Sequence, residues 1–287
     1  MPCILFSGCL WGNTIGSLKI FAAFLTAACV PQQQATAAGD PAYGYVVGNF
    51  SDSESKNGVP VKMPEGFVSL LEYNDSPGLD PEKWRTYKPS KRTFQSPIMS
   101  FGIVVNYKTG EIFDSSQHPV GTAEKWRELP DSPWVSVSIS SGIDYQKPPH
   151  LNKYLEYIET FKEDKKPEYF ATKLPEKRYG LTVYANPNIN PTTGRLWTDK
   201  ADSTSYYFAF DDKGNVVSAI DCSNRDVPHP PCEHRFDAPD INVNIRVLYD
   251  HFHLEDWQQI EAGVRKAVYS LTRHPDALAA APNSKTK

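Results

Sequence analysis

The sequence has no excess of basic residues. Its 287 residues include 30 Lys and Arg against 34 Asp and Glu, which gives a formal net charge of −4 at pH 7. A protein that binds a phosphate backbone needs a basic field to attract it. The charge balance therefore predicts no nucleic-acid partner, and the 40% share of hydrophobic residues predicts a soluble globular body with a sizeable core.

The chain also lacks the local signatures of common active sites. It contains no Gly-x-Ser-x-Gly elbow, no His-Glu-x-x-His pair, no phosphate-binding glycine loop and no EF-hand loop. The serines of 138–141 lie in an alternating strand pattern, and Asp211 and Asp212 are explained by a turn. We therefore expect a protein that is not an enzyme and holds no cofactor, with an envelope hydrolase of unrecognised type as the alternative.

Charged residues are nearly absent from the first 38 positions, where Lys19 is the single one. The apolar run Ile20–Ala28 that follows has the length of a signal-peptide core and is too short to cross a bilayer alone. Leu25 to Ala28 resemble the lipobox of bacterial lipoproteins, which precedes the cysteine that carries diacylglycerol. The pattern predicts export and lipidation of Cys29.

Other interpretations of this segment stay open. An ordinary cleaved signal or an uncleaved anchor helix fits if the apolar parts join across Lys19, and a cytoplasmic protein fits if the small residues merely precede a buried cysteine. Val30 follows Cys29, whereas an aspartate there would favour retention in the inner membrane. The expected location is the periplasm, with the lipid anchor in the outer membrane.

The chain is expected to contain four parts. The glutamine-rich stretch after Cys29 has the composition of a flexible tether, and the last residues lack periodicity. These features predict a signal peptide at 1–28, a lipidated cysteine and tether at 29–42, a single α+β globular domain at 43–272 and a loose tail at 273–287.

Cysteines are few, and three of the five lie in the first 29 residues. The remaining pair, Cys222 and Cys232, would be joined in an oxidising exported compartment. Because prolines crowd the segment 228–231 between them, the bond would close a stiff loop and add roughly 2–3 kcal/mol of stability on the chain-entropy model. A metal site with His229 and His234 is the alternative, but the spacing fits no standard zinc pattern. We expect a disulfide and no metal.

Most apolar runs are short, which is typical of strands. Hairpins are predicted at Val104–Phe113 and Tyr206–Ile220, around Lys-Thr-Gly and Asp-Asp-Lys-Gly turns. The strictest alternation runs from Ile241 to Tyr249 and predicts a strand with one buried face. Further strands are predicted at Tyr45–Phe50, Gly66–Glu72, Trp134–Ser140 and Gly180–Tyr184.

Helical spacing of apolar residues occurs in two segments. It predicts a mid-chain helix at Leu151–Phe161 and an amphipathic helix at Leu254–Leu271. The expected fold class is α+β: a predominantly antiparallel β-sheet with hairpins, one mid-chain helix, and a C-terminal amphipathic helix packed on the sheet.

One tetrapeptide occurs twice, as Glu82-Lys-Trp-Arg85 and Glu124-Lys-Trp-Arg127. Coincidence is one interpretation. In the other, two similar surface turns present Trp84 with Arg85 and Trp126 with Arg127 to a binding partner, because hot spots favour these residue types. Trp134 and Trp197 are further candidate anchors, and a core position is the alternative for each tryptophan.

The last third of the chain combines several features in order. Cys222 is followed by the prolines of 228–231, then by Cys232 with His234 and Phe236, the alternating strand to Tyr249, and the Leu254–Ile260 opening of the last helix. This block resembles the C-terminal region of bacterial immunity lipoproteins that neutralise lipase (phospholipase) effectors of the type VI secretion system.

The resemblance implies a non-catalytic protein, tethered in the periplasm, that binds and inhibits a cognate lipase toxin. Its partners would be that toxin and, through the lipid anchor, a membrane. An envelope lipoprotein with a structural or assembly role is the alternative function.

Overall fold

The computed structural model describes residues 44–52, 58–78, 80–129, 131–160, 171–187, 194, 204–225 and 227–280. The chain divides into a unit at Met1–Ala37 and a unit at Ala38–Lys287, and the fold belongs to the second. The predicted signal peptide, Cys29 and the tether lie outside the described residues, as does Trp197. Among the described helices, none has the length and apolar character needed to cross a membrane.

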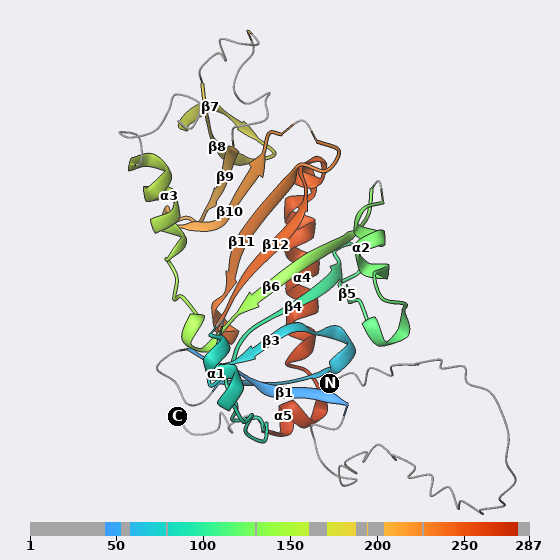
Figure 1. The fold of residues 1–287 in the computed structure, drawn as a ribbon. Helices are drawn as coiled ribbons and strands as arrows, with labels where there is room; N and C mark the ends of the chain where they lie inside the picture. The colour runs from blue at the N-terminus through green and yellow to red at the C-terminus, as the bar shows by residue number, and fades with distance from the viewer. Residues whose placement is uncertain are drawn as a thin grey trace, which may run out of the picture. The chain divides into compact units, whose positions relative to one another are not determined.

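One antiparallel sheet organises the described domain (Figure 1). Its strand order is β3-β4-β6-β12-β11-β10-β9-β8-β7, and the short strand β5 pairs with β4. The strands are β3 (Ser69–Tyr73), β4 (Ile98–Asn106), β5 (Glu111–Ile112), β6 (Trp134–Ser140), β7 (Thr172–Arg178), β8 (Leu181–Ala185), β9 (Thr204–Phe210), β10 (Val216–Ser223), β11 (Pro231–Ala238) and β12 (Val243–Asp250). A separate hairpin is formed by β1 (Tyr45–Phe50) and β2 (Val59–Pro64).

The central strands follow a period of two, because successive side chains of a strand point to opposite faces. In β6, Val135, Val137 and Ile139 are buried, while the serines between them are partly exposed. Val137 lies opposite Val247 of β12 and Ile103 of β4, so the apolar positions of three strands form one continuous face. The other face of these strands carries small or polar side chains together with the partly exposed Val104 and Leu248.

Helix α4 (Trp257–Leu271) covers the apolar face. Its buried residues Ile260, Val264 and Val268 recur at helical spacing, and each contributes roughly 1.5–3 kcal/mol by leaving water. Gly263 permits the close approach, since a Cβ there would lie 1.9 Å from the carbonyl oxygen of Tyr107 in the turn after β4. The β1–β2 hairpin packs on the same core, where Phe50 stacks on Phe101.

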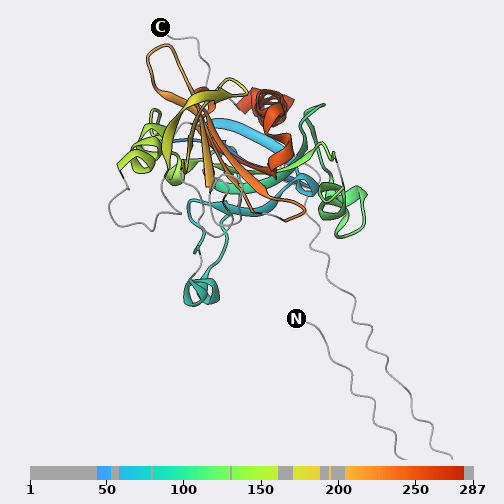
Figure 2. The same ribbon diagram turned by 90° about the horizontal axis from the view of Figure 1, so that it is seen from above.

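The opposite face is covered at one end of the sheet by α3 (Leu151–Thr160). Its residues Leu151 and Ile158 join a second, smaller core with Tyr184, Phe208 and Ala219 of β8, β9 and β10. Two short helices, α1 (Pro81–Thr86) and α2 (Thr122–Arg127), lie in the connections that flank β4 and β6. Figure 2 shows α4 on one side of the sheet and α1 projecting on the other.

The structure confirms the predicted fold class, an antiparallel sheet with a mid-chain helix and a C-terminal helix packed on it. The bounds of β1 and β6 agree with the prediction, and both predicted hairpins are present as β4–β5 and β9–β10. The last helix begins later than expected, at Trp257, because His251–Asp256 form a 3-10 turn.

Part of the expected loose tail is helical. Pro275–Ala280 form α5, which packs on β2. Ala277 is buried there, and the Asp276 carboxylate pairs with Lys62 Nζ at 2.6 Å. A helix this short shows no periodicity in the sequence, and its contacts with β2 rather than an intrinsic pattern hold it in place.

Candidate functional site

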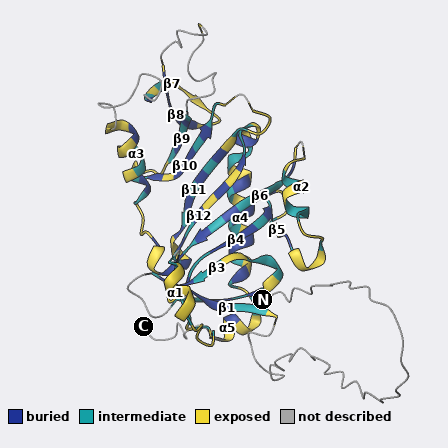
Figure 3. Cartoon of the chain, in the orientation of Figure 1, coloured by how far each residue is buried: buried dark blue, intermediate teal, exposed yellow. Residues whose placement is uncertain are grey.

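Among the residues that the structure describes, none forms a helix or strand over one face of the central strands between α3 and the β3–β4 edge, and Figure 3 is drawn facing it. We call this surface the open face. Strand pairing places its side chains in rows, since Ser138 of β6 lies opposite Arg246 of β12, which in turn lies opposite Arg235 of β11. A second row joins Ser140, Asn244 and Asp237, and a third joins Ser136, Leu248 and Glu233.

Small residues form the floor on one side of Arg246. Gly102 and Ser100 of β4 continue the rows of Ser138 and Ser140. The larger side chains stand on the other side, on β11 and on α3. Arg246 stands between these small and larger side chains, and we call this strip of the open face the trough.

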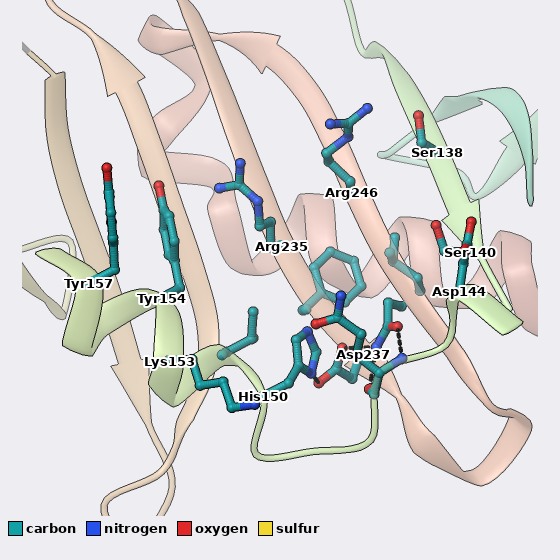
Figure 4. Close-up of a pocket in the computed structure, with 15 residues that line it drawn as sticks. Ser138, Ser140, Asp144, His150, Lys153, Tyr154, Tyr157, Arg235, Asp237 and Arg246 are labelled. Atoms are coloured by element: carbon teal, nitrogen blue, oxygen red, sulfur yellow. Dashed lines mark hydrogen bonds and ion pairs between the residues drawn. The ribbon is translucent and has the colours of Figure 1, made fainter. Parts of the chain in front are cut away.

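A cavity of about 590 Å³ lies where the trough meets α3. Figure 4 shows Tyr154 and Tyr157 of α3 at one side, Arg235 and Arg246 in the middle, and the serines of β6 at the other side. The complete lining is Ser138, Ser140, Asp144, Gln146, His150, Leu151, Lys153, Tyr154, Tyr157, Arg235, Phe236, Asp237, Asn244, Ile245 and Arg246.

Arg235 is held in place from several directions. Its guanidinium pairs with the carboxylates of Asp221 and Glu233 and lies over the Tyr154 ring, 4.7 Å from the centroid. Burial acts to lower the pKa of Arg235, but Asp221, Tyr154 and Glu233 together outweigh burial and raise it. Burial and then Asp221 raise the pKa of Tyr154, so its hydroxyl stays protonated. This cluster fixes the α3 wall of the cavity relative to its floor.

Arg246 is much less constrained. Its side chain is 53% exposed, and its ion pair with Glu233 spans 3.5 Å to a carboxylate that also pairs with Arg235. The two arginines are direct cross-strand neighbours, an arrangement that places like charges side by side. Arg246 therefore presents guanidinium donors to whatever covers the trough, and a carboxylate is the group that would match them in two parallel hydrogen bonds.

At the far end of the cavity, hydrogen bonds connect the segment before α3 to strands β11 and β12. Asn244 Nδ2 donates to Asp237 Oδ1 at 2.7 Å and to the Gln146 carbonyl at 2.9 Å, and Asn244 Oδ1 accepts from the Gln146 amide at 2.7 Å. His150 Nδ1 lies 3.5 Å from the second Asp237 oxygen. Burial raises the pKa of Asp237, although the Asn244 hydrogen bond acts against it. These bonds hold the segment before α3 against β11 and β12.

Two serines of the open face, Ser138 and Ser140, line its cavity. None of the hydrogen bonds among the described residues joins Ser138 or Ser140 to a histidine or a carboxylate. A serine nucleophile needs such a base within hydrogen-bond reach. Among the described residues, neither Ser138 nor Ser140 has such a hydrogen-bonded base.

A serine, a histidine and a glutamate lie close together on the other side of the sheet, but their arrangement is not that of a catalytic triad. Ser218 Oγ lies 2.6 Å from His234 Nε2, and Glu261 Oε2 lies 3.5 Å from that same nitrogen, while Nδ1 has no hydrogen-bond partner. In a catalytic triad the acid holds the opposite ring nitrogen. Ser218 is 1% exposed and His234 0%, so this cluster is a buried structural network under α4.

The structure confirms the predicted disulfide between Cys222 and Cys232. The two cysteines are direct cross-strand partners in β10 and β11, so the bond joins neighbouring strands as well as closing the proline-rich loop. Of the histidines considered as metal ligands beside it, His229 bonds Asp250 at 2.7 Å and His234 bonds Ser218.

Trp84 and Arg85 lie on α1. Trp84 is 51% exposed, donates from Nε1 to the Gly78 carbonyl at 2.7 Å and packs edge-on against Tyr87. Arg85 pairs with Glu82 of the same helix at 3.0 Å. The α1 tryptophan is thus presented on a small projecting turn with few neighbours.

Trp126 and Arg127 lie on α2 and have different surroundings. Trp126 packs among Phe113, His118 and Trp134, and Arg127 donates to the Ser136 hydroxyl at the edge of the open face. No hydrogen bond, ion pair or ring contact between described residues joins α1 to α2. The two copies of the tetrapeptide therefore have different surroundings, and their role in partner binding stays a prediction.

The residues that sequence reasoning missed are Arg235, Arg246 and the α3 tyrosines. The signal for Arg246 was present, since it is the charged residue on the outer face of the strongly alternating strand to Tyr249. Its neighbours come from β6 and β11, and only the strand order brings them beside it.

Comparison with known proteins gives little further information. No family model matches the chain. No curated protein sequence is similar to it. Among solved structures, the chain is similar to Smlt3025, an immunity protein of the Stenotrophomonas maltophilia type IV secretion system, with a TM-score of 0.43 and 16% identity over 79% of this chain and 94% of that chain. A likeness this distant assigns neither a fold family nor a partner.

Proposed function

We propose that this chain is a periplasmic immunity lipoprotein that binds and inhibits a cognate lipase effector of the type VI secretion system. In this proposal the open face around Arg246 is the surface that contacts the lipase. Lipidation of Cys29 would tether the domain to the outer membrane, in the compartment where a phospholipase acts.

The observation that carries the binding role is the arrangement of Arg246. It stands in a trough bounded by Tyr154 and Tyr157, and its long ion pair leaves donors for a partner. Tyrosine and arginine are the residue types in which binding energy concentrates, especially at the centre of a surface. Arg235 is already fixed by its own carboxylates, so the floor of the trough is ordered before a partner arrives.

Two further features agree with the proposal. An inhibitor needs a rigid surface and no reacting group, and among the described residues no hydrogen bond joins Ser138 or Ser140 to a histidine or a carboxylate. The Cys222–Cys232 disulfide suits an oxidising compartment such as the periplasm. The identity of the partner as a lipase rests on the resemblance of the block from Cys222 to Ser270.

The function is tested by periplasmic co-expression with a candidate lipase effector of the type VI secretion system. Cells that make the lipase alone should die, and cells that also make this chain should survive. Charge reversal at Arg246 (R246E) should remove protection, because the new carboxylate would repel the partner's carboxylate that is expected to pair with Arg246.

The matched control is R273E, which reverses an exposed arginine just after α4. It should protect like the wild type. If the wild-type chain gives no protection, the immunity function is wrong. If R246E protects as fully as R273E at equal amounts of folded protein, the open face is not the binding surface.

The anchor is tested separately by labelling cells with a radioactive fatty acid. The wild-type chain should carry the label in the outer-membrane fraction. A Cys29→Ala variant should carry none, and equal labelling of that variant would show that Cys29 is not the attachment point.

A further inference from the structure

A second pocket lies beside α2, away from the cavity of the open face. Its volume is about 660 Å³, and its walls include Phe113, His118, Trp126 and Trp134. These aromatic residues come from the segment after β5, the helix α2 and the start of β6. We call it the aromatic pocket.

The rings of the aromatic pocket support one another. Trp126 and Trp134 have centroids 5.4 Å apart, and Phe113 stands nearly perpendicular to both, at 87° to each. Phe113 is buried against the end of the sheet, whereas both tryptophans are partly exposed. The two indoles are thus held by packing and still offer surface to a ligand.

Acidic residues line the same pocket. Glu111, Asp114 and Asp131 contribute to its lining, and no lysine or arginine of the described part of the chain does. None of the ion pairs among the described residues involves these three carboxylates, although Asp114 Oδ1 accepts from the Ser116 amide and hydroxyl. The charge of the pocket is therefore negative and is not balanced from within.

The geometry points to a basic side chain of the partner protein, an arginine guanidinium or a lysine ammonium, as the occupant of the aromatic pocket. The faces of tryptophan rings attract a cation, and the carboxylates add to that attraction. A purely apolar occupant would strip water from the carboxylates without replacing its hydrogen bonds. The proposed function supplies the identity of the partner here, while the preference for a cation follows from the pocket itself.

The repeated tetrapeptide provides a matched control. Trp84 has the same preceding and following residues as Trp126, but it lies on α1 with Tyr87 as its ring contact. A variant at Trp84 removes an exposed tryptophan without touching the aromatic pocket.

The test is an NMR titration of the full chain that follows its indole N–H signals. The cationic probe is N-acetyl-arginine amide, and the neutral control is N-acetyl-citrulline amide, which has nearly the same shape. The arginine probe should shift two indole signals that W126L and W134L remove, with a dissociation constant in the millimolar range. The citrulline probe should shift neither.

Two variants test the two halves of the pocket. The double variant E111Q/D131N keeps the shapes of its side chains, and asparagine tolerates the positive φ of 58° at position 131. It should weaken arginine binding by roughly five-fold or more. W126L should weaken it by at least as much, whereas W84L should leave it unchanged.

Equal binding of the arginine and citrulline probes would overturn the inference, as would equal losses in W84L and W126L. The outcome is separate from that of the proposed function. If the chain fails to protect against the lipase but binds the arginine probe, the immunity function fails and the cation pocket stands. If it protects but binds neither probe, the cation pocket fails alone.

Discussion

At the scale of single residues, two neighbouring arginines of the open face differ in what surrounds them. Arg235 contacts two carboxylates and an aromatic ring, whereas Arg246 pairs with a single carboxylate, which also pairs with Arg235. We therefore expect Arg235 to stabilise the fold and Arg246, whose guanidinium has donors left for further hydrogen bonds, to bind a partner. The two roles can be separated by substitution.

We expect R235A to lower the free energy of unfolding by about 1–3 kcal/mol, because it leaves Asp221 and Glu233 without their cation. R246A should change it by less than about 0.5 kcal/mol, since its side chain is exposed and its ion pair is long. Urea unfolding monitored by circular dichroism measures both. An equal loss in the two variants would contradict the division of roles.

The burial of His234 allows a prediction of how the stability of the fold depends on pH. Burial lowers its pKa below the usual 6.5, although Glu261 acts in the opposite direction, so the folded state holds the ring neutral. The unfolded chain takes up a proton near pH 6.5, and stability should therefore fall as the pH drops below that value. Burial lowers the pKa of His251 and His253 as well, which adds to the same trend.

The measurement is the urea midpoint of the wild type and of H234Q between pH 7.5 and pH 5. The wild type should lose stability on acidification, and H234Q should lose less because one titrating ring is gone. A wild type that becomes more stable toward pH 5 would show that the folded state prefers the protonated ring.

At the scale of secondary-structure elements, sequence periodicity predicts correctly those strands and helices whose buried positions are all apolar. Strand β6 alternates valine and isoleucine with serine, and α4 repeats apolar residues at helical spacing, so both were predictable. Strand β11 was not predicted, although it also alternates. Its inward positions include Cys232 and His234, and it begins at Pro231, so its apolar signal is weak.

The cavity of the open face could not be predicted for a different reason. Ser138, Arg235 and Arg246 are neighbours only because β6 pairs with β12 and β12 with β11. The order of strands in a sheet depends on long-range pairing, which local patterns do not encode. The disulfide was predictable because it needed only the cysteine count and the expected compartment.

The Cys222–Cys232 bond connects β10 to β11, the strand that carries Arg235. Its removal in the double variant C222S/C232S should cost roughly 2–3 kcal/mol on the chain-entropy model. Urea unfolding of the wild type with and without dithiothreitol should give a similar difference, and the double variant should not respond to the reductant. Equal stability of all forms would show that the strands need no such link.

At the scale of the whole molecule, the two faces of the sheet are covered by helices and hairpins to different extents. One face is closed by α4 and the β1–β2 hairpin, and the other is covered by α3 at a single end. Antiparallel sheets often leave one face to water, but here the uncovered part contains an exposed arginine beside a cavity. This asymmetry is what makes the open face the candidate surface for a partner.

The most direct test of the open face is the affinity of the purified, unlipidated chain for the lipase against which it protects cells, measured by isothermal titration calorimetry. R246E should weaken binding by about 30-fold or more, as expected for a central anchor, and R273E should bind within about two-fold of the wild type. Equal affinities of R246E and the wild type, or no binding by the wild type, would contradict the account.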